Sequence, residues 1–342
     1  MKKFFFLTAA ATMLFAACQK TEVVYNEGPQ EIAMFAVNNL ATKDPVTSTT
    51  FPTNDDMQVV AYLADGGTAG DYFGATVFGK TGTNWVGGKY WPITGATINF
   101  LAVSQPEGAA PVTTTFPETP YASKAVVTLN DNSTEQYDLM YAFGQGKKVE
   151  GETPDAVDMV FKHALSLIAF KVKAAEGATI TVKSITLDKA NYSGKLTLTN
   201  SSYNATGAVA TANVSPAWSD WSSLVENKSV FSGSQNCTNS AVACGTETLV
   251  VPNNETLMNT AGFTVTYSID NSSPVVYSAK FGSPDKWEAG KKYTYVISFG
   301  AADPIEIAPS VDLYVTENGI VVDGDPETNG DETDDDINVN VQ

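Results

Sequence analysis

The stretch Phe263–Asp270, FTVTYSID, decides the fold class because its apolar and polar residues alternate strictly. The apolar set is Phe263, Val265, Tyr267 and Ile269. A period of two is typical of a β-strand that buries one face. Tyr293–Phe299, YTYVISF, repeats the pattern, because its tyrosines, isoleucine and phenylalanine fall on one parity. Two such stretches so close together predict neighbouring strands of a half-buried sheet.

Similar strand signals occur along most of the chain. Val, Thr, Tyr, Phe and Ile are frequent, and clusters of Gly, Asn, Asp and Pro separate the strand-like runs. Ile98, Phe100 and Ala102 predict a further strand that is mostly buried. No long segment has a clean helical period. We therefore expect an antiparallel all-β fold, of the kind found in β-sandwiches.

One segment changes its pattern midway. In Val160–Val172, VFKHALSLIAFKV, apolar residues occupy one parity up to Leu167 and the opposite parity from Ile168 onward. A bulge, or a strand that crosses from one sheet to another, would produce this shift. A short helix over residues 163–167 is the alternative, whereas residues 170–173 are expected to be extended.

The N-terminus, MKKFFFLTAAATMLFAAC, has the pattern of a bacterial lipoprotein signal. Two lysines precede the apolar run Phe4–Phe15, which is too short to span a bilayer as a stable helix, and small residues lead to Cys18. We therefore expect residues 1–17 to be removed and Cys18 to carry lipid in the outer membrane. Acyl chains contribute about 0.8 kcal/mol for each buried CH₂, so several chains on one residue would anchor the protein stably.

Composition argues against several classes of function. The formal net charge is −18 and the 20 basic residues are all lysines, so nucleic acid is not an expected partner. No nucleotide-binding, zinc-protease or serine-hydrolase motif is present. The only histidine, His163, lies in an apolar strand-like segment, where a structural role is expected. We expect no cofactor, no metal site and no enzymatic activity.

Two cysteines remain after Cys18 is assigned to lipid. Cys237 and Cys244 lie in a Ser-, Asn- and Ala-rich stretch, and an oxidising compartment would allow a disulfide that closes a short loop. A metal site is the less favoured alternative, because no histidine or further cysteine lies nearby to complete four ligands. The acidic run Asp323–Asp336 is expected to be solvated rather than to bind calcium.

Five segments together resemble the fimbrillin-like lipoproteins of Bacteroidetes, which are subunits of outer-membrane fimbriae. They are Lys89–Val103, Asp138–Ala142, Val160–Val172, Ile180–Leu187 and Trp287–Phe299. Their order and spacing after a lipoprotein signal carry the resemblance, which covers most of residues 30–300. It implies two transthyretin-like β-sandwich domains with a C-terminal strand extension. The expected division is 18–43 for a lipidated leader, 44–175 and 176–300 for the sandwiches, and 301–342 for the donor strand and acidic tail.

The resemblance also implies a route of assembly. In fimbrillins a first β-strand fills a groove in the N-terminal domain until a trypsin-like surface protease cuts behind it, and a C-terminal strand of a neighbouring subunit then takes its place. Here Glu31–Leu40 resembles the first strand and Lys43 resembles the cleavage site. The implied donor residues are Ile305, Ile307, Val311, Leu313, Val315, Ile320 and Val322. Their alternative role is an ordinary edge strand of the C-terminal domain.

The function expected from these signals is that of a structural subunit of a cell-surface fimbria. Its expected partners are other fimbrial subunits, the outer-membrane lipid through Cys18 and the processing protease. A tip or anchor subunit, with a role in cell adhesion, is the first alternative. A glycan-binding surface lipoprotein that uses exposed tryptophans is the second, and its candidates are Trp85, Trp91, Trp218, Trp221 and Trp287.

Overall fold

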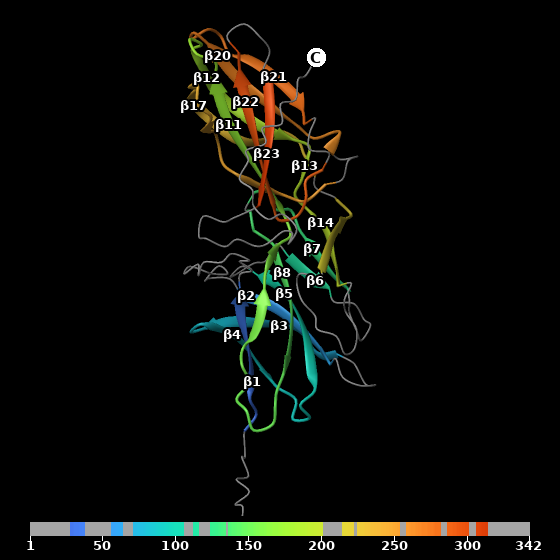
Figure 1. Cartoon of the computed structure of the whole chain (residues 1–342). Helices are drawn as coiled ribbons and strands as arrows, with labels where there is room; N and C mark the ends of the chain where they lie inside the picture. The colour runs from blue at the N-terminus through green and yellow to red at the C-terminus, as the bar shows by residue number, and fades with distance from the viewer. Residues whose placement is uncertain are drawn as a thin grey trace, which may run out of the picture.

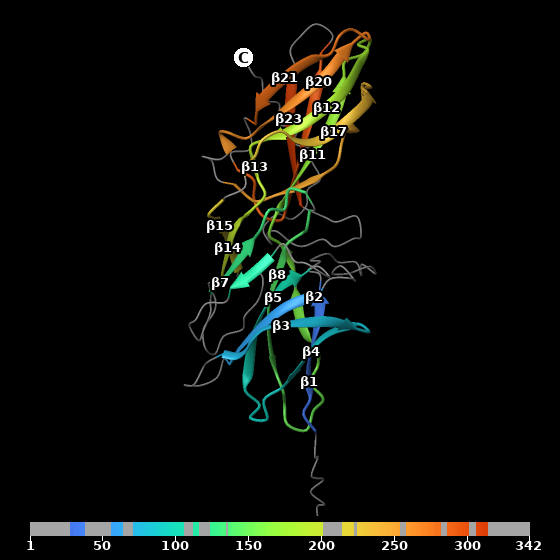
Figure 2. The same ribbon diagram turned by 180° about the vertical axis from the view of Figure 1, so that it is seen from behind.

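The computed structural model describes residues 28–37, 56–63, 71–105, 112–115, 124–134, 136–200, 214–221, 224–253, 258–281, 286–300 and 306–313. The elements assigned within these ranges are β-strands, which confirms the predicted all-β fold class. The molecule is elongated: β1–β5 lie toward one end and β20–β23 toward the other (Figure 1), and the view from behind shows the same separation (Figure 2).

The N-terminal end is built on an eight-stranded sheet with the order β10-β8-β5-β2-β3-β4-β1-β9. Its strands are β1 (Glu31–Val37), β2 (Asp56–Leu63), β3 (Asp71–Thr81), β4 (Asn84–Tyr90), β5 (Thr97–Gln105), β8 (Met140–Lys147), β9 (Val157–Val160) and β10 (Lys162–His163). Every pair in this sheet is antiparallel except β1 with β9, which is parallel. The strand nearest the N-terminus therefore lies inside the sheet, not at its edge.

This sheet folds over on itself, so that β1, β4 and β9 face β2, β5 and β8 across a hydrophobic core. We call this cluster the N-terminal core; its larger members include Ile32, Met34, Met57, Phe78, Trp85, Trp91, Phe100, Met140 and Met159. Trp91 meets Phe100 edge-on, with ring centroids 5.9 Å apart. The central strands are also buried on their second face, where Val60, Leu101 and Tyr141 point away from this core. Strands buried on both faces explain why Ile98–Ala102 has so few polar residues.

A four-stranded sheet covers that second face, with the order β15-β14-β7-β6. Its strands are β6 (Val112–Thr115), β7 (Lys124–Leu129), β14 (Gly194–Asn200) and β15 (Val214–Ser219). The cluster that it covers, the middle core, includes Val60, Leu101, Val127, Leu129, Tyr141, Phe143, Leu165, Leu167, Leu196, Leu198 and Leu249. Because β7 precedes residue 175 and β14 follows it, the two predicted sandwich segments share a sheet. The division at residues 175 and 176 stays a prediction.

The C-terminal end is a sandwich of two sheets. One sheet has the order β18-β11-β22-β23, with β19 also paired to β11, and the other has the order β17-β12-β20-β21. The first contains β11 (Ser166–Ala174), β18 (Val242–Ala243), β19 (Thr248–Val250), β22 (Lys291–Phe299) and β23 (Glu306–Leu313). The second contains β12 (Ile180–Asp188), β17 (Lys228–Asn236), β20 (Gly262–Ile269) and β21 (Val275–Lys280), and β13 (Ala190–Asn191) pairs with β16 (Leu224–Val225) beside them.

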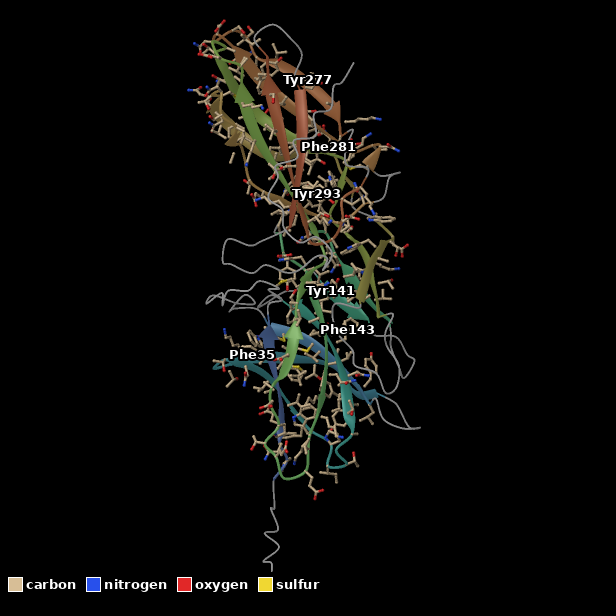
Figure 3. The ribbon with its side chains drawn as sticks, viewed as in Figure 1. Phe35, Tyr141, Phe143, Tyr277, Phe281 and Tyr293 are labelled. Carbon is tan, nitrogen blue, oxygen red and sulfur yellow. The ribbon has the colours of Figure 1, made fainter. Side chains whose placement is uncertain are left out.

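Aromatic rings fill the space between these two sheets. Phe281 lies 4.2 Å from Tyr295 and 5.5 Å from Trp287, measured between ring centroids, and Tyr293 lies nearby (Figure 3). In β22 the predicted inward set is fully buried, from Tyr293 to Phe299. In β20 the prediction is confirmed for Phe263 and Val265, whereas Ile269 is 43% exposed. The β12–β20 ladder shifts register between Val182 and Ser184, and beyond this shift Ser268 is buried in place of Ile269.

The change of pattern in Val160–Val172 marks a crossing between the two ends. β10 belongs to the N-terminal sheet and β11 to the C-terminal sheet. Leu165 and Leu167 consequently enter the middle core. Ile168 and Phe170 enter the C-terminal core, the hydrophobic cluster between the two sheets of the C-terminal sandwich. The predicted strand crossing is therefore confirmed, and the alternative of a short helix over residues 163–167 is wrong.

Candidate functional site

The position of β1 is the feature of this fold that bears most directly on function. β1 lies between β4 and β9 and pairs with both of them, antiparallel to β4 and parallel to β9. Met34 is paired on both sides, with Trp85 in β4 and with Val157 in β9. A strand held at both edges fills a slot, and its removal would leave two unpaired strand edges facing each other.

The inward face of β1 completes the N-terminal core. Ile32 and Met34 are fully buried and Ala36 is 9% exposed, whereas Phe35 on the opposite face is 40% exposed and points outward in Figure 3. Burying a large aliphatic side chain contributes roughly 1.5–3 kcal/mol relative to leaving it in water. Burial of Ile32 and Met34 therefore contributes several kcal/mol to the binding of β1 in the slot. An empty slot would expose apolar pockets at alternate positions.

Polar contacts set the register at the start of β1. The backbone N–H of Gly88 donates to Glu31 Oε1 at 2.9 Å, and the N–H of Trp91 donates to the carbonyl of Gln30 at 2.9 Å. The β1–β4 ladder shifts register between Glu31 and Ala33, which marks a bulge at this point. Gly88 has φ +65, a backbone conformation that a glycine adopts without strain. These contacts determine which residues of β1 face the core.

Two glycines of β8 make room for β9, the strand that forms the second edge of the slot. A Cβ atom at Gly144 would lie 2.6 Å from Met159 Sδ in β9, and one at Gly146 would lie 2.4 Å from the Trp91 ring. The backbone of β8 is therefore in close contact with β9 and with Trp91. Sequence reasoning missed this feature, although two glycines within a strand are a signal of close approach.

We expect Gly146→Val to destabilise the N-terminal core, because its side chain would displace Trp91 or β9. Overpacking of a core costs roughly 1–3 kcal/mol, and urea unfolding of the purified protein measures the loss. Gly74→Ala in β3 is the control, since a Cβ atom there meets nothing within 4 Å. Equal stability of Gly146→Val and wild type would mean that β9 does not lie against β8.

The processing and lipidation sites predicted from the sequence lie outside the described residues. Cys18 and Lys43 precede or follow β1 in the chain, and Lys43 is six residues beyond the end of that strand at Val37. The donor residues Ile305, Val315, Ile320 and Val322 also lie outside the described ranges. The structure therefore places only Ile307, Val311 and Leu313 of the predicted donor set.

These three residues belong to β23, which is an edge strand of the C-terminal sheet. β23 runs antiparallel to β22, and the ladder pairs Ile307 with Ile297 and Val311 with Tyr293. Val311 is 45% exposed. In this structure β23 is thus paired within its own subunit, which is the alternative role that the sequence left open.

Cys237 and Cys244 are free cysteines that contact the C-terminal core. The carbonyl of Thr238 accepts from the N–H of Ala174, and the N–H of Cys244 donates to the carbonyl of Phe170, so the two ends of the loop bond to residues four apart on β11. The two thiols are unpaired in this structure, and their pairing stays a prediction.

The chemistry of these thiols gives a testable expectation. Burial raises the pKa of Cys237 to about 11, and burial together with the neighbouring Cys237 raises the pKa of Cys244 to about 12. Because the thiolate is the reactive form, alkylation of the reduced native protein should be slow at pH 8 and accelerate about tenfold per pH unit until it approaches these values. Mass spectrometry before reduction shows whether the thiols are paired, and fast alkylation at pH 8 would contradict the burial.

The tryptophans do not form an exposed platform. Trp85, Trp91 and Trp287 are buried. The half-buried Trp218 donates its indole N–H to the carbonyl of Ala164 at 2.9 Å, and Trp221 donates to the carbonyl of Pro252 at 3.1 Å. The first contact joins β15 to the crossing between β10 and β11, and the second joins Trp221 to the segment after β19. These five side chains therefore pack the protein, which removes the observation that favoured glycan binding.

His163 is buried as well, and its Nδ1 lies 2.7 Å from Asp138 Oδ2. A histidine that is 1% exposed cannot reach a substrate in solution, so the pair is structural. Within the described ranges, no group of three or more His, Cys, Asp and Glu side chains is arranged to hold a metal ion. The described residues also contain no helix that is long and apolar enough to cross a membrane.

The family model for fimbrillin-like proteins matches residues 45–313 of this chain. The chain belongs to the fimbrillin-like family. Among solved structures, a fimbrial protein from Bacteroides vulgatus is similar in fold, with a TM-score of 0.55, 14% identity, and coverage of 83% of this chain and 99% of that one. At this identity the likeness concerns the fold alone, and it agrees with the predicted β-sandwich architecture.

Two further solved structures are less similar in fold. The fimbrial anchor protein Mfa2 from Porphyromonas gingivalis has a TM-score of 0.37 and 11% identity, over 84% of this chain and 98% of that one. A fimbrial assembly protein from Parabacteroides distasonis has a TM-score of 0.40 and 10% identity, over 84% and 99%. No curated protein sequence matches this chain. Family membership confirms the resemblance seen in the sequence.

Proposed function

We propose that this fimbrillin-like protein is a structural subunit of a cell-surface fimbria that polymerises by exchange of β1 for a strand of a neighbouring subunit. The observation that carries the proposal is the insertion of β1, the strand nearest the N-terminus, between β4 and β9. A strand at the end of the chain can leave without unthreading the rest of the fold. Because β1 lies between two strands, the strand of a neighbouring subunit that replaces it would form two ladders of hydrogen bonds.

The proposed leader is the segment 18–43, exported with lipid on Cys18 and retained at the outer membrane. A trypsin-like protease could cut it after either of its two basic residues, Lys20 and Lys43. Cleavage after Lys20 would remove the lipid but keep β1, whereas cleavage after Lys43 would detach both together. Only the second cut couples release from the membrane to an open slot, so Lys43 is the proposed processing site.

The proposed polymer is held by contacts that do not close on themselves. A subunit would donate a C-terminal strand to the slot of the next subunit while its own slot accepts the strand of the previous one. Such heterologous contact generates a filament. In this proposal residues 44–175 and 176–300 form the body of the subunit, with β14 and β15 packed on β7, and residues 301–342 supply the donor.

Deletion of residues 304–342 tests the proposal. We expect the truncated subunit, once cut after Lys43, to stay monomeric in size-exclusion chromatography and electron microscopy, whereas the full chain forms fibres. Unfolding of the truncated monomer is measured in parallel, because the deletion removes β23 from β22. Fibres from the truncated chain would contradict the proposal. A full chain that accepts strands but does not extend would instead identify a tip subunit, and lipid-bound subunits at the fibre base would identify an anchor.

A further inference from the structure

Resting on the proposed strand exchange, we infer that the donor strand is Ile337–Val341, at the end of the chain, and that β23 stays in its own subunit. The inference starts from the properties of the slot. A donor must have apolar side chains at three alternate positions, as β1 has at Ile32, Met34 and Ala36. It must also have backbone N–H groups available toward both β4 and β9, because the slot has two edges.

β23 does not meet the second requirement. Pro309 lies in the middle of the strand, opposite Tyr295, and a proline has no N–H to donate. Proline is compatible with an edge strand, whose outer side faces no partner, but an interior strand with proline loses a hydrogen bond. The residue thus suits β23 to its present place at the edge of the C-terminal sheet and not to the slot.

β23 also contributes to its own domain. Eight consecutive residues pair with β22, from Glu306 opposite Ser298 to Leu313 opposite Lys291. Transfer of β23 to a neighbour would break this ladder and expose the edge of β22, whose side chains Tyr295 and Ile297 are fully buried. Each donated β23 would then lose one ladder against the two that the slot offers. The ladder runs to Leu313, so a donor segment beyond this residue would leave β23 paired with β22.

Two segments beyond Leu313 have apolar alternation. Gly319–Asp323, GIVVD, offers only Ile320 and Val322 on one parity, with Asn318 at the preceding position of that parity. It would fill two of the three pockets. Ile337–Gln342, INVNVQ, offers Ile337, Val339 and Val341 on one parity and contains no proline. This segment alone reproduces the three-residue pattern of β1, with asparagines on the outward positions that Ala33 and Phe35 occupy.

The chain between β23 and this segment is long enough to reach a neighbour. Ile337 lies 24 positions after Leu313, a length of chain that can span up to about 80 Å when extended. The connecting residues include the acidic run Asp323–Asp336, which favours an extended, solvated linker. The donor could therefore leave the subunit while β23 remains paired with β22.

Single substitutions in the full-length chain test the assignment, with polymer measured by sedimentation after trypsin-like cleavage. Val339→Asp places a charge at the middle position, which Met34 fills in β1. We expect it to lower the polymer yield roughly tenfold or more, the ratio that corresponds to about 1.4 kcal/mol. Asn338→Asp is the matched control, since its side chain points outward, and it should polymerise normally. Val311→Asp in β23 should polymerise normally as well, because Val311 is already 45% exposed.

A peptide of sequence DINVNVQ, residues 336–342, provides a second readout that does not need assembly of mutant chains. It should bind the cleaved subunit and stop fibre growth, whereas the same peptide with Val339→Asp should not. Normal polymerisation of Val339→Asp overturns the inference, and so does loss of polymer in Val311→Asp. In either case the proposed function survives if deletion of residues 304–342 still abolishes fibres, and it fails if that deletion polymerises.

Discussion

Replacement of Lys43 by alanine is expected to keep β1 attached to the subunit, so that the precursor does not enter fibres. A trypsin-like protease needs a basic side chain before the bond that it cuts, and the chain has no basic residue between Lys43 and Lys80 in β3. β1 would therefore remain in its slot, and the donor strand of a neighbour would find both ladders already occupied. The fraction of subunits in purified fibres, measured by immunoblot, should fall to background.

Two control variants make this result specific. Lys43→Arg keeps the positive charge and should be cut and assembled as wild type is. Lys20→Ala removes the other basic residue of the leader but leaves the cut behind β1 possible, so it should also assemble. Fibre formation by Lys43→Ala would contradict the account, and loss of assembly in Lys20→Ala would move the processing site to Lys20.

Met34→Asp is expected to damage the precursor and to have no effect on the fibre. Met34 is fully buried in the N-terminal core. Truncation of a buried methionine lowers the stability of a protein by roughly 2–5 kcal/mol, and burial of a carboxylate lowers it further. Urea unfolding of the precursor should show this loss. After cleavage, however, residue 34 has left with the leader, and the mature subunit is identical to wild type.

Met57→Asp is the matched control, because Met57 is equally buried in the same core but lies in β2, which the mature subunit keeps. It should destabilise the precursor and the mature subunit alike and abolish fibres. If Met34→Asp and Met57→Asp impair the fibre equally, β1 is a permanent part of the subunit. The pair therefore separates a detachable strand from an ordinary core strand.

The sequence predicted most of the fold where the residue pattern was strong. Strict alternation located β20 and β22, and the change of parity in Val160–Val172 predicted the crossing from the N-terminal sheet to β11. These predictions succeeded because the two faces of each strand meet different surroundings, which period-two patterns record directly. Ile269 departed from its pattern because the buried face changes parity beyond the register shift of the β12–β20 ladder, where Ser268 is buried instead.

The partners of β1 could not be predicted in the same way. Alternation in Glu31–Val37 shows that a strand has one buried face, but it does not identify the strands that pair with it. The parallel pairing with β9 joins residues more than 120 positions apart. The pairing of β14 with β7 was hidden for the same reason, because hydrogen bonds between backbones leave little record in side-chain type. Gly144 and Gly146 were a local signal of the close contact of β8 with β9 and Trp91.

The measurement that tests the central claim most directly is the identity of the N-terminal residue of the subunit in purified fibres, determined by mass spectrometry. The account predicts Asp44, because β1 and the lipidated Cys18 leave together when Lys43 is cut. An N-terminus at Cys18 or at Thr21 in assembled subunits would contradict it, because β1 would then still be attached to the subunit and its slot would not have been vacated.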